Sequence, residues 1–299
     1  MQSMHNQPHD LLHKGLKMDS YVFFIVLFAA FTHALWHFAT KKVSGNFTIF
    51  WYGLYFVSIL QLGYTFYLLA SAGFNRDGLV FLFVTSAAHF FYFVTFLYTY
   101  SKSEISSVYP ISRGTGVAGT SIFSYFFFHE IITPVAAMGI ASVFLGIMFI
   151  GFSSLRNQKM DKKTFLVAFL TGITIIIYSL TDKQGVAFNN PVMYLNFANL
   201  IALTPMVFFA NRGGFKKSFS VFRANFKYAM IIGFGSIGTY LIILYAMTLE
   251  RASYIVSMRE FSVVIASFLG FIFLKEKPTV LKIIGILCVA TGLILIKAG

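Results

Sequence analysis

The sequence predicts an all-α membrane protein in which ten transmembrane helices form an inverted repeat of two five-helix bundles. Three observations support this fold class. Of the 299 residues, 58% are hydrophobic and only 11% are charged, whereas soluble domains carry about 25% charged residues. Ten mostly apolar stretches are each long enough to cross a bilayer, which takes about 20 residues in a helix. The third observation is an internal sequence repeat.

Short connections with turn residues and positive charges separate the ten stretches, and none is long enough for a soluble domain. The Asp182-Lys183 pair is expected to close the sixth span at the membrane interface. The expected spans are 20–40, 47–72, 78–100, 104–128, 131–153, 164–182, 191–211, 228–249, 252–274 and 278–297.

The repeat divides the chain into four parts. Residues 1–19 are a polar tail with no assigned function, and 20–153 form the first five-helix unit. A basic linker loop at 154–163 leads to the second unit at 164–299.

Residues 104–151 align without gaps on 250–297, with 13 of 48 positions identical. The identical pairs include Arg113/Arg259, Glu130/Glu276, Thr133/Thr279, Gly139/Gly285 and Gly146/Gly292. Shared apolar composition does not align charged residues and glycines, so duplication is the better explanation. Because each unit has an odd number of helices, the second enters the membrane from the opposite side. Such inverted repeats are typical of transporters, whose substrate sites lie near the midplane.

The net charge of +13 comes largely from Lys and Arg in the connections, where they act as topology signals rather than as a nucleic-acid surface. Counting these residues by side favours both termini outside the cell. The single cysteine, Cys288, excludes an intrachain disulfide and a cysteine-rich metal site.

Two segments carry a family resemblance: SSVYPISRGTGVAGTSIFSYFFFHE at 106–130 and ASYIVSMREFSVVIASFLGFIFLKE at 252–276. Each is followed by a glycine-spaced helix. In these segments the sequence resembles the drug/metabolite transporter superfamily, specifically its EamA-type members. Relatives typically end the two helices in Gly-Glu or Lys-Glu, and His129-Glu130 departs mildly from that pattern. The resemblance implies a metabolite transporter, and it also implies cytoplasmic termini, which leaves orientation open.

Arg113 and its repeat mate Arg259 are the main candidates for substrate binding. Arg113 lies about 15 Å into its helix, near the middle of a ~30 Å core, where ionisable residues are costly and usually functional. Guanidinium groups suit carboxylate or phosphate. Glu260 points about 100° away from Arg259, and it is expected to pair with Arg113 or with a cation on the substrate. The alternative is a structural ion-pair network. The resemblance favours binding, because related carriers place basic residues on the corresponding helices against anionic substrates.

Pro110, Gly114 and Gly116 surround Arg113 on its helix. The proline frees a backbone carbonyl and bends the helix, so these residues form a candidate hinge. Close helix packing is the alternative for the glycines.

His33, Trp36 and His37 share one face of the first span. Trp36 is expected to face the substrate, and His33 or His37 is a candidate proton-coupling site, with a structural role as the alternative. The two histidines lack a third ligand, so no metal site and no cofactor are expected. Tyr109, Tyr92 and Tyr240 complete the expected substrate-binding set. Tyr92 with His89, and Tyr240, lie mid-helix and are the better cavity candidates, and Tyr178 and Tyr254 are further candidates.

No phosphate-binding loop, zinc-protease motif or nucleophile elbow occurs in a plausible context. The sequence therefore predicts no enzyme but a secondary transporter, which moves a small anionic or zwitterionic metabolite by alternating access through a central cavity. The alternatives are an intramembrane or lipid-modifying enzyme and a channel. The expected setting is the inner membrane of a bacterium. The expected partners are the lipid bilayer, a metabolite and, as candidates, protons, whereas no nucleic acid is expected. The protein is expected to be a monomer or a homodimer.

Overall fold

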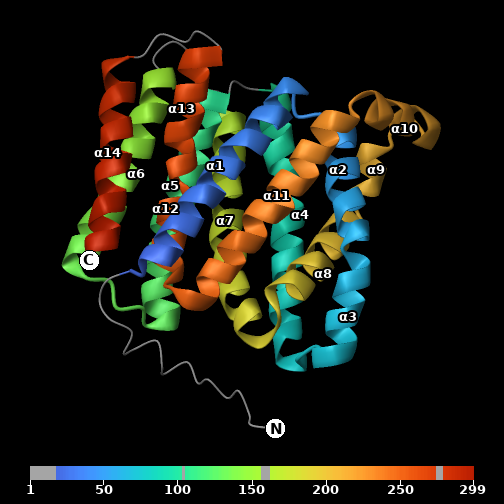
Figure 1. Cartoon of the computed structure of the whole chain (residues 1–299). Coiled ribbons are helices and arrows are strands. Elements are labelled where there is room, and N and C mark those ends of the chain that lie inside the picture. Colours follow the sequence, from blue (N-terminus) through green and yellow to red (C-terminus); the bar gives the residue numbers. More distant parts are fainter. Residues whose placement is uncertain (1–17, 103–104, 156–161, 274–278) are drawn as a thin grey trace.

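The computed structural model describes residues 18–102, 105–155, 162–273 and 279–299. Side chains are described for the same residues except 100–102, 105–110, 153–155, 270 and 273. The described residues are helical with short connections and contain no strand (Figure 1). The elements are α1 Ser20–Lys42, α2 Phe47–Leu60, α3 Leu62–Ala72, the 3₁₀ turn η2 Arg76–Gly78, α4 Leu79–Lys102, α5 Ile105–Phe128, α6 Pro134–Leu155, α7 Lys162–Phe188, α8 Pro191–Leu203, α9 Val207–Ala210, α10 Phe215–Ala224, α11 Phe226–Leu249, α12 Ala252–Arg259, α13 Phe261–Phe273 and α14 Val280–Ala298.

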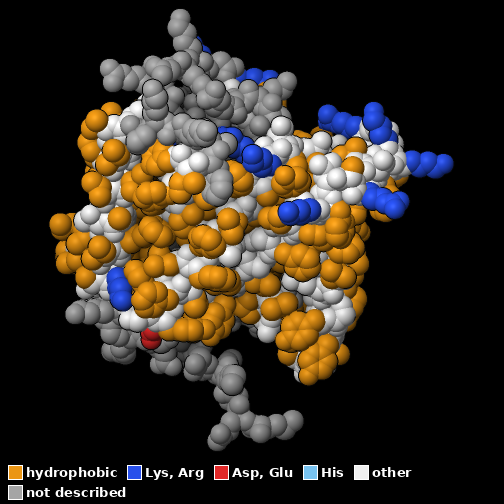
Figure 2. Space-filling view, turned by 45° about the horizontal axis from the view of Figure 1, so that its top comes forward, with side chains coloured by type: hydrophobic (Ala, Val, Ile, Leu, Met, Phe, Trp, Pro, Cys, Tyr) orange, Lys and Arg blue, Asp and Glu red, His pale blue; other side chains and the backbone are white. Residues whose placement is uncertain are grey.

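The helices confirm an all-α membrane protein. Among the described residues, seven helices are long and apolar enough to cross a membrane, or eight if the bent pair α2 and α3 is one span. The expected number of ten spans stays a prediction. Large hydrophobic side chains cover much of the outer surface, while exposed Lys and Arg gather around α10 (Figure 2). An apolar exterior of this kind is suited to lipid.

Three predicted spans consist of two helices each. The stretch 47–72 bends by 44° between α2 and α3, 191–211 breaks between α8 and α9, and 252–274 breaks at Glu260. The predicted basic connection at 212–227 contains α10. In α10, Ser218 and Phe222 are buried while Lys216, Lys217 and Arg223 are exposed. Its amphipathic pattern explains why a basic segment folds as a helix at the edge of the membrane region.

The packing of α6 against α14 reflects the sequence repeat (Figure 1). A Cβ atom on Gly139 would stand 2.7 Å from the carbonyl oxygen of Gly292, and one on Gly146 would stand 2.6 Å from that of Gly285. Each glycine thus packs against the repeat mate of the other. This exchange of partners is what a two-fold relation between the units requires.

The repeat also extends to helix caps. Thr133 accepts a hydrogen bond from the backbone of Ala136 at the start of α6 (3.1 Å). Its mate Thr279 accepts one from Lys282 at the start of α14 (3.3 Å). A threonine that caps the first turn satisfies a backbone N–H that otherwise has no partner. The four-part division of the chain stays a prediction, and most of the tail 1–19 lies outside the described residues.

Candidate functional site

The two repeat-mate arginines and Glu260 form one buried charged cluster. Nη1 of Arg113 donates to Oε1 of Glu260 at 3.1 Å. Nε of Arg259 lies 3.7 Å from the same oxygen. Adjacent side chains on a regular helix point about 100° apart, yet Arg259 and Glu260 are within ion-pair distance. The relative exposure of the three residues is 2%, 1% and 0%, so the cluster is closed off from solvent in this conformation.

A break in the helix places Arg259 and Glu260. The last residue of α12 is Arg259, and α13 begins after Glu260. Here the backbone makes two short-range bonds: the Glu260 N–H donates to Ser257 O at 3.2 Å, and the Val263 N–H donates to Glu260 O at 2.9 Å. Such a 3₁₀ segment inside a helix often marks a functional hinge.

Arg259 has hydrogen-bond donors that no described residue satisfies, and the cluster has an excess of positive charge. Nε and Nη2 of Arg259 and Oε2 of Glu260 are buried and have no hydrogen-bond partner within the described residues. Two guanidinium groups share one carboxylate, which leaves one positive charge in the trio. Because an uncompensated buried charge is costly, the arrangement is suited to bind an anionic group at Arg259. Oε2 of Glu260 can accept a hydrogen bond from an ammonium group.

One face of α1 covers Arg113. Nε2 of His33 contacts Nη2 of Arg113 at 2.5 Å. A guanidinium only donates, so Nε2 must accept and His33 carries its proton on Nδ1. Trp36 and His37 pack beside it, with ring centroids of His33 and His37 4.3 Å apart and those of Trp36 and His37 3.8 Å apart. All three side chains face the protein interior.

Asp182 is a functional candidate that sequence reasoning missed. The expected solvated helix end at Asp182-Lys183 is wrong, because α7 continues to Phe188 and Asp182 is 1% exposed. Its carboxylate accepts hydrogen bonds from Thr85 of α4 (2.6 Å) and from the hydroxyl of Tyr240 of α11. No sequence spacing connects these three residues.

The other expected residues divide by location. Tyr240 binds Asp182, and Tyr92 of α4 lies edge-on to Tyr178 with centroids 5.5 Å apart. Gly114 faces α6 and Gly116 packs against Ile175 of α7. These contacts show close packing, while a hinge role stays a prediction. Tyr109 and Pro110 lie in the first turns of α5, and their side chains are outside the described residues.

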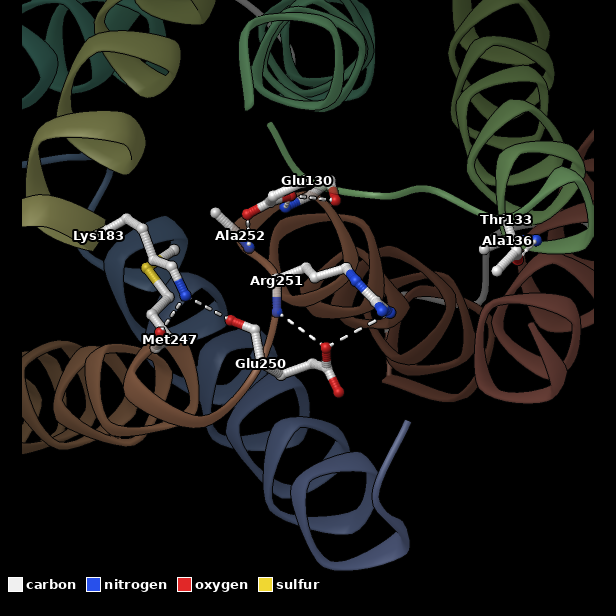
Figure 3. Close-up of polar contacts among 9 residues, drawn as sticks. Glu130, Thr133, Ala136, Lys183, Met247, Glu250, Arg251 and Ala252 are labelled. Carbon is white, nitrogen blue, oxygen red and sulfur yellow. Dashed lines mark hydrogen bonds and ion pairs between the residues drawn. The ribbon is translucent and has the colours of Figure 1, made fainter. Parts of the chain in front are cut away.

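Polar contacts hold the end of α11 and the start of α12 (Figure 3). Glu130 accepts from the backbone of Ala252 at 2.6 Å and from the hydroxyl of Ser253 at 2.6 Å at the start of α12. Nζ of Lys183 donates to the carbonyls of Met247 and Glu250 at the end of α11, at 2.6 and 2.7 Å. The negative Glu130 lies at the N-terminus of α12 and the positive Lys183 lies at the C-terminus of α11, so each charge interacts favourably with the helix dipole.

Two outer grooves of about 390 Å³ each lie away from this cluster. One is formed by α1, α8 and α11 and includes Tyr21 and Tyr245. The other is formed by α5 and α6 and includes Ser121 and Phe144. Neither groove is lined by Arg113 or Arg259, so the central cavity stays a prediction.

The model of the EamA-like transporter family matches residues 162–298. Twenty-six chains of solved structures match as well. One, described only as the crystal structure of a protein, aligns with a TM-score of 0.63 and 12% sequence identity over 93% of this chain and 96% of its own. At this identity the likeness shows a shared fold alone. No curated protein matches the chain.

Proposed function

Residues 162–298 are an EamA-like transporter domain of the drug/metabolite transporter superfamily, and on that premise we propose that the protein is a secondary transporter of a small anionic or zwitterionic metabolite. The observation that carries the proposal is the buried Arg259, whose Nε and Nη2 have no hydrogen-bond partner in the described part of the chain. A substrate carboxylate or phosphate satisfies these donors and neutralises the remaining charge. The expected location of the protein is the inner membrane of a bacterium.

The proposed substrate site lies where the two units meet. Arg113 comes from the first unit, and Arg259 and Glu260 come from the second. A bound anion competes with Glu260 for the guanidinium groups, so binding loosens the ion pair that joins α5 and α12. Because the cluster is closed in this conformation, transport requires it to open alternately to each side. The break at Glu260 is the proposed hinge of the second unit.

The other expected residues receive supporting roles in this proposal. His33, Trp36 and His37 orient Arg113 by contact and packing. A positively charged imidazole beside two guanidinium groups is electrostatically unfavourable, so we assign positioning rather than proton coupling to these histidines. Tyr92 borders the same interior through Tyr178.

Uptake into proteoliposomes tests the proposal. Purified protein is reconstituted and screened with radiolabelled amino acids, small carboxylates and sugar phosphates. Arg259→Gln is expected to reduce uptake of the accepted solute at least tenfold, because one charge-assisted bond contributes about 1.5–3 kcal/mol. Arg76→Gln, at an exposed position in η2, is the matched control. Uptake that is unchanged in Arg259→Gln removes the site assignment, and no uptake of any solute by the wild type argues against transport.

A further inference from the structure

Asp182 stands at the centre of a second buried polar cluster, separate from the Arg113–Glu260 pair. Thr85 and His89 face it from α4, Tyr240 from α11 and Tyr194 from α8, and Tyr178 lies one turn earlier on α7. The cluster joins α4, α7 and α11.

The partners of Asp182 are neutral hydroxyl groups. Among the described residues, the ion pairs within 4.0 Å do not include Asp182. The neighbouring Lys183 turns away, because its ammonium donates to Met247 and Glu250 instead. A buried carboxylate without a cation partner is costly when ionised, and a proton removes that cost.

Hydroxyl partners permit both protonation states. A hydroxyl carries one rotatable donor and two acceptor positions. When Asp182 is ionised, its two oxygens accept from Thr85 and Tyr240. When a proton binds at Oδ2, that proton is donated to the Tyr240 oxygen, and the hydrogen of the Tyr240 hydroxyl rotates away from the carboxyl group. No hydrogen bond to the carboxyl group is lost, and the only chemical change is one bound proton.

His89 extends the cluster. Its Nδ1 lies 3.0 Å from the Thr85 carbonyl and 3.1 Å from the Thr85 hydroxyl. Because a carbonyl only accepts, Nδ1 carries the proton. The ring stacks on Tyr178 with centroids 4.5 Å apart. Thr85 thus connects the Asp182 carboxylate to a second titratable group.

The two clusters lie near each other. Tyr240 binds Asp182, its ring centroid is 5.8 Å from that of Tyr178, and both tyrosines are close to Arg259. Counting Asp182 with the charged cluster gives two guanidinium groups and two carboxylates. An ionised Asp182 therefore offsets the excess positive charge of the two clusters taken together without contacting Arg259, and an anion bound at Arg259 takes over that role.

We propose that Asp182 is a proton-binding site held by Thr85 and Tyr240, and that its protonation is linked to occupancy of Arg259 by an anion. The anion and the proton then bind together and leave together, which is proton symport. The linkage to transport rests on the proposed function, whereas the proton site itself does not.

Infrared spectroscopy of the purified full-length protein tests the proton site without any solute. The protonated carboxylic acid C=O band is followed as a function of pH. The band that appears on acidification is expected to be missing in Asp182→Asn and unchanged in Asp77→Asn, a matched control at an exposed position. If Asp182→Asn shows the same buried-acid titration as the wild type, the proton site is wrong.

Two further variants test the surroundings of Asp182 and do not require the Asn variant to fold. Tyr240→Phe removes a hydrogen-bond donor to the ionised Asp182 carboxylate. The midpoint of the Asp182 titration is therefore expected to move to higher pH by about one unit, a tenfold change in proton affinity. Arg259→Gln removes a nearby cation that favours the ionised carboxylate, and it is expected to move the same midpoint in the same direction. An unchanged midpoint in Tyr240→Phe overturns the site, and an unchanged midpoint in Arg259→Gln overturns the linkage alone.

Discussion

Arg113 of α5 and Glu260 at the α12–α13 break lie 3.1 Å apart, nitrogen to oxygen, and both are almost wholly buried. They come from the two aligned segments, 104–151 and 250–297. The same Glu260 oxygen lies 3.7 Å from Arg259. One carboxylate therefore contacts both repeat-mate guanidinium groups.

Glu260→Gln is expected to destabilise the protein by about 3 kcal/mol, because it removes the carboxylate that contacts both buried guanidinium groups. Thermal unfolding in detergent measures the loss. The double variant Arg113→Gln/Glu260→Gln should be less destabilised than the sum of the single variants, since it removes one of the repelling charges together with the carboxylate. Additive effects would show that the pair does not interact.

Glu130→Gln should weaken the attachment of α12 to the segment after α5. The Glu130 carboxylate caps α12 through the backbone of Ala252 and the hydroxyl of Ser253. Loss of the charge removes charge-assisted bonds and the favourable interaction with the helix N-terminus, at a cost of about 1–2 kcal/mol.

The matched control for Glu130→Gln is Glu250→Gln, whose partner Arg251 follows it directly in sequence and lies 3.7 Å away. Because that pair is partly exposed, its loss should lower the melting temperature by much less. Equal effects of the two variants on the melting temperature would contradict a specific role for Glu130.

Gly146→Ala should destabilise the packing of α6 on α14 by about 2 kcal/mol. The new Cβ atom would stand 2.6 Å from the carbonyl oxygen of Gly285, which is a backbone atom and cannot rotate away. Gly63→Ala provides the comparison, because nothing lies within 4 Å of a Cβ at that position. Similar melting temperatures for the two alanine variants would show that the glycine contact does not constrain the interface.

His129→Gly should stabilise the protein by about 1 kcal/mol. His129 follows the end of α5 with φ of 50°, a left-handed conformation that costs residues with a Cβ about 1–2 kcal/mol and that glycine adopts readily at helix ends. His129→Ala keeps the Cβ and should give no gain in melting temperature. If alanine stabilises as much as glycine, the effect comes from loss of the imidazole rather than from the backbone.

The left-handed conformation of His129 shows why glycine would fit at this position. Relatives that the chain resembles place Gly or Lys before the glutamate. Glycine is suited to the turn that brings Glu130 back to α12. The resemblance located this position, but only the backbone angle shows why glycine fits there.

Much of the fold was predictable because it follows from local composition and from the repeat. Apolar stretches marked the helical segments, and repeat identities such as Thr133/Thr279 correspond to equivalent helix caps. The sequence also indicated the two mirrored arginines. Glu260 was expected to pair with Arg113 or with substrate, and the structure shows the contact with Arg113.

Asp182 and the helix breaks were not predictable, because their partners are distant in sequence. A charged Asp-Lys pair usually ends a membrane helix at the water interface. Here α7 continues because Thr85 and Tyr240 satisfy Asp182, while the α11 carbonyls satisfy Lys183. No proline or glycine marks the break at Glu260, and the side chain there pairs with Arg113 of α5, which is distant in sequence.

The central claim is that Arg259 receives the anionic group of the substrate. Solute-induced thermal stabilisation tests it most directly, because a ligand that binds the folded protein at 100 times its Kd stabilises it by about 2.7 kcal/mol. A solute taken up by proteoliposomes should raise the melting temperature of the wild type and of Arg76→Gln, and should leave that of Arg259→Gln unchanged. Equal stabilisation of Arg259→Gln and the wild type by the same solute would contradict the assignment.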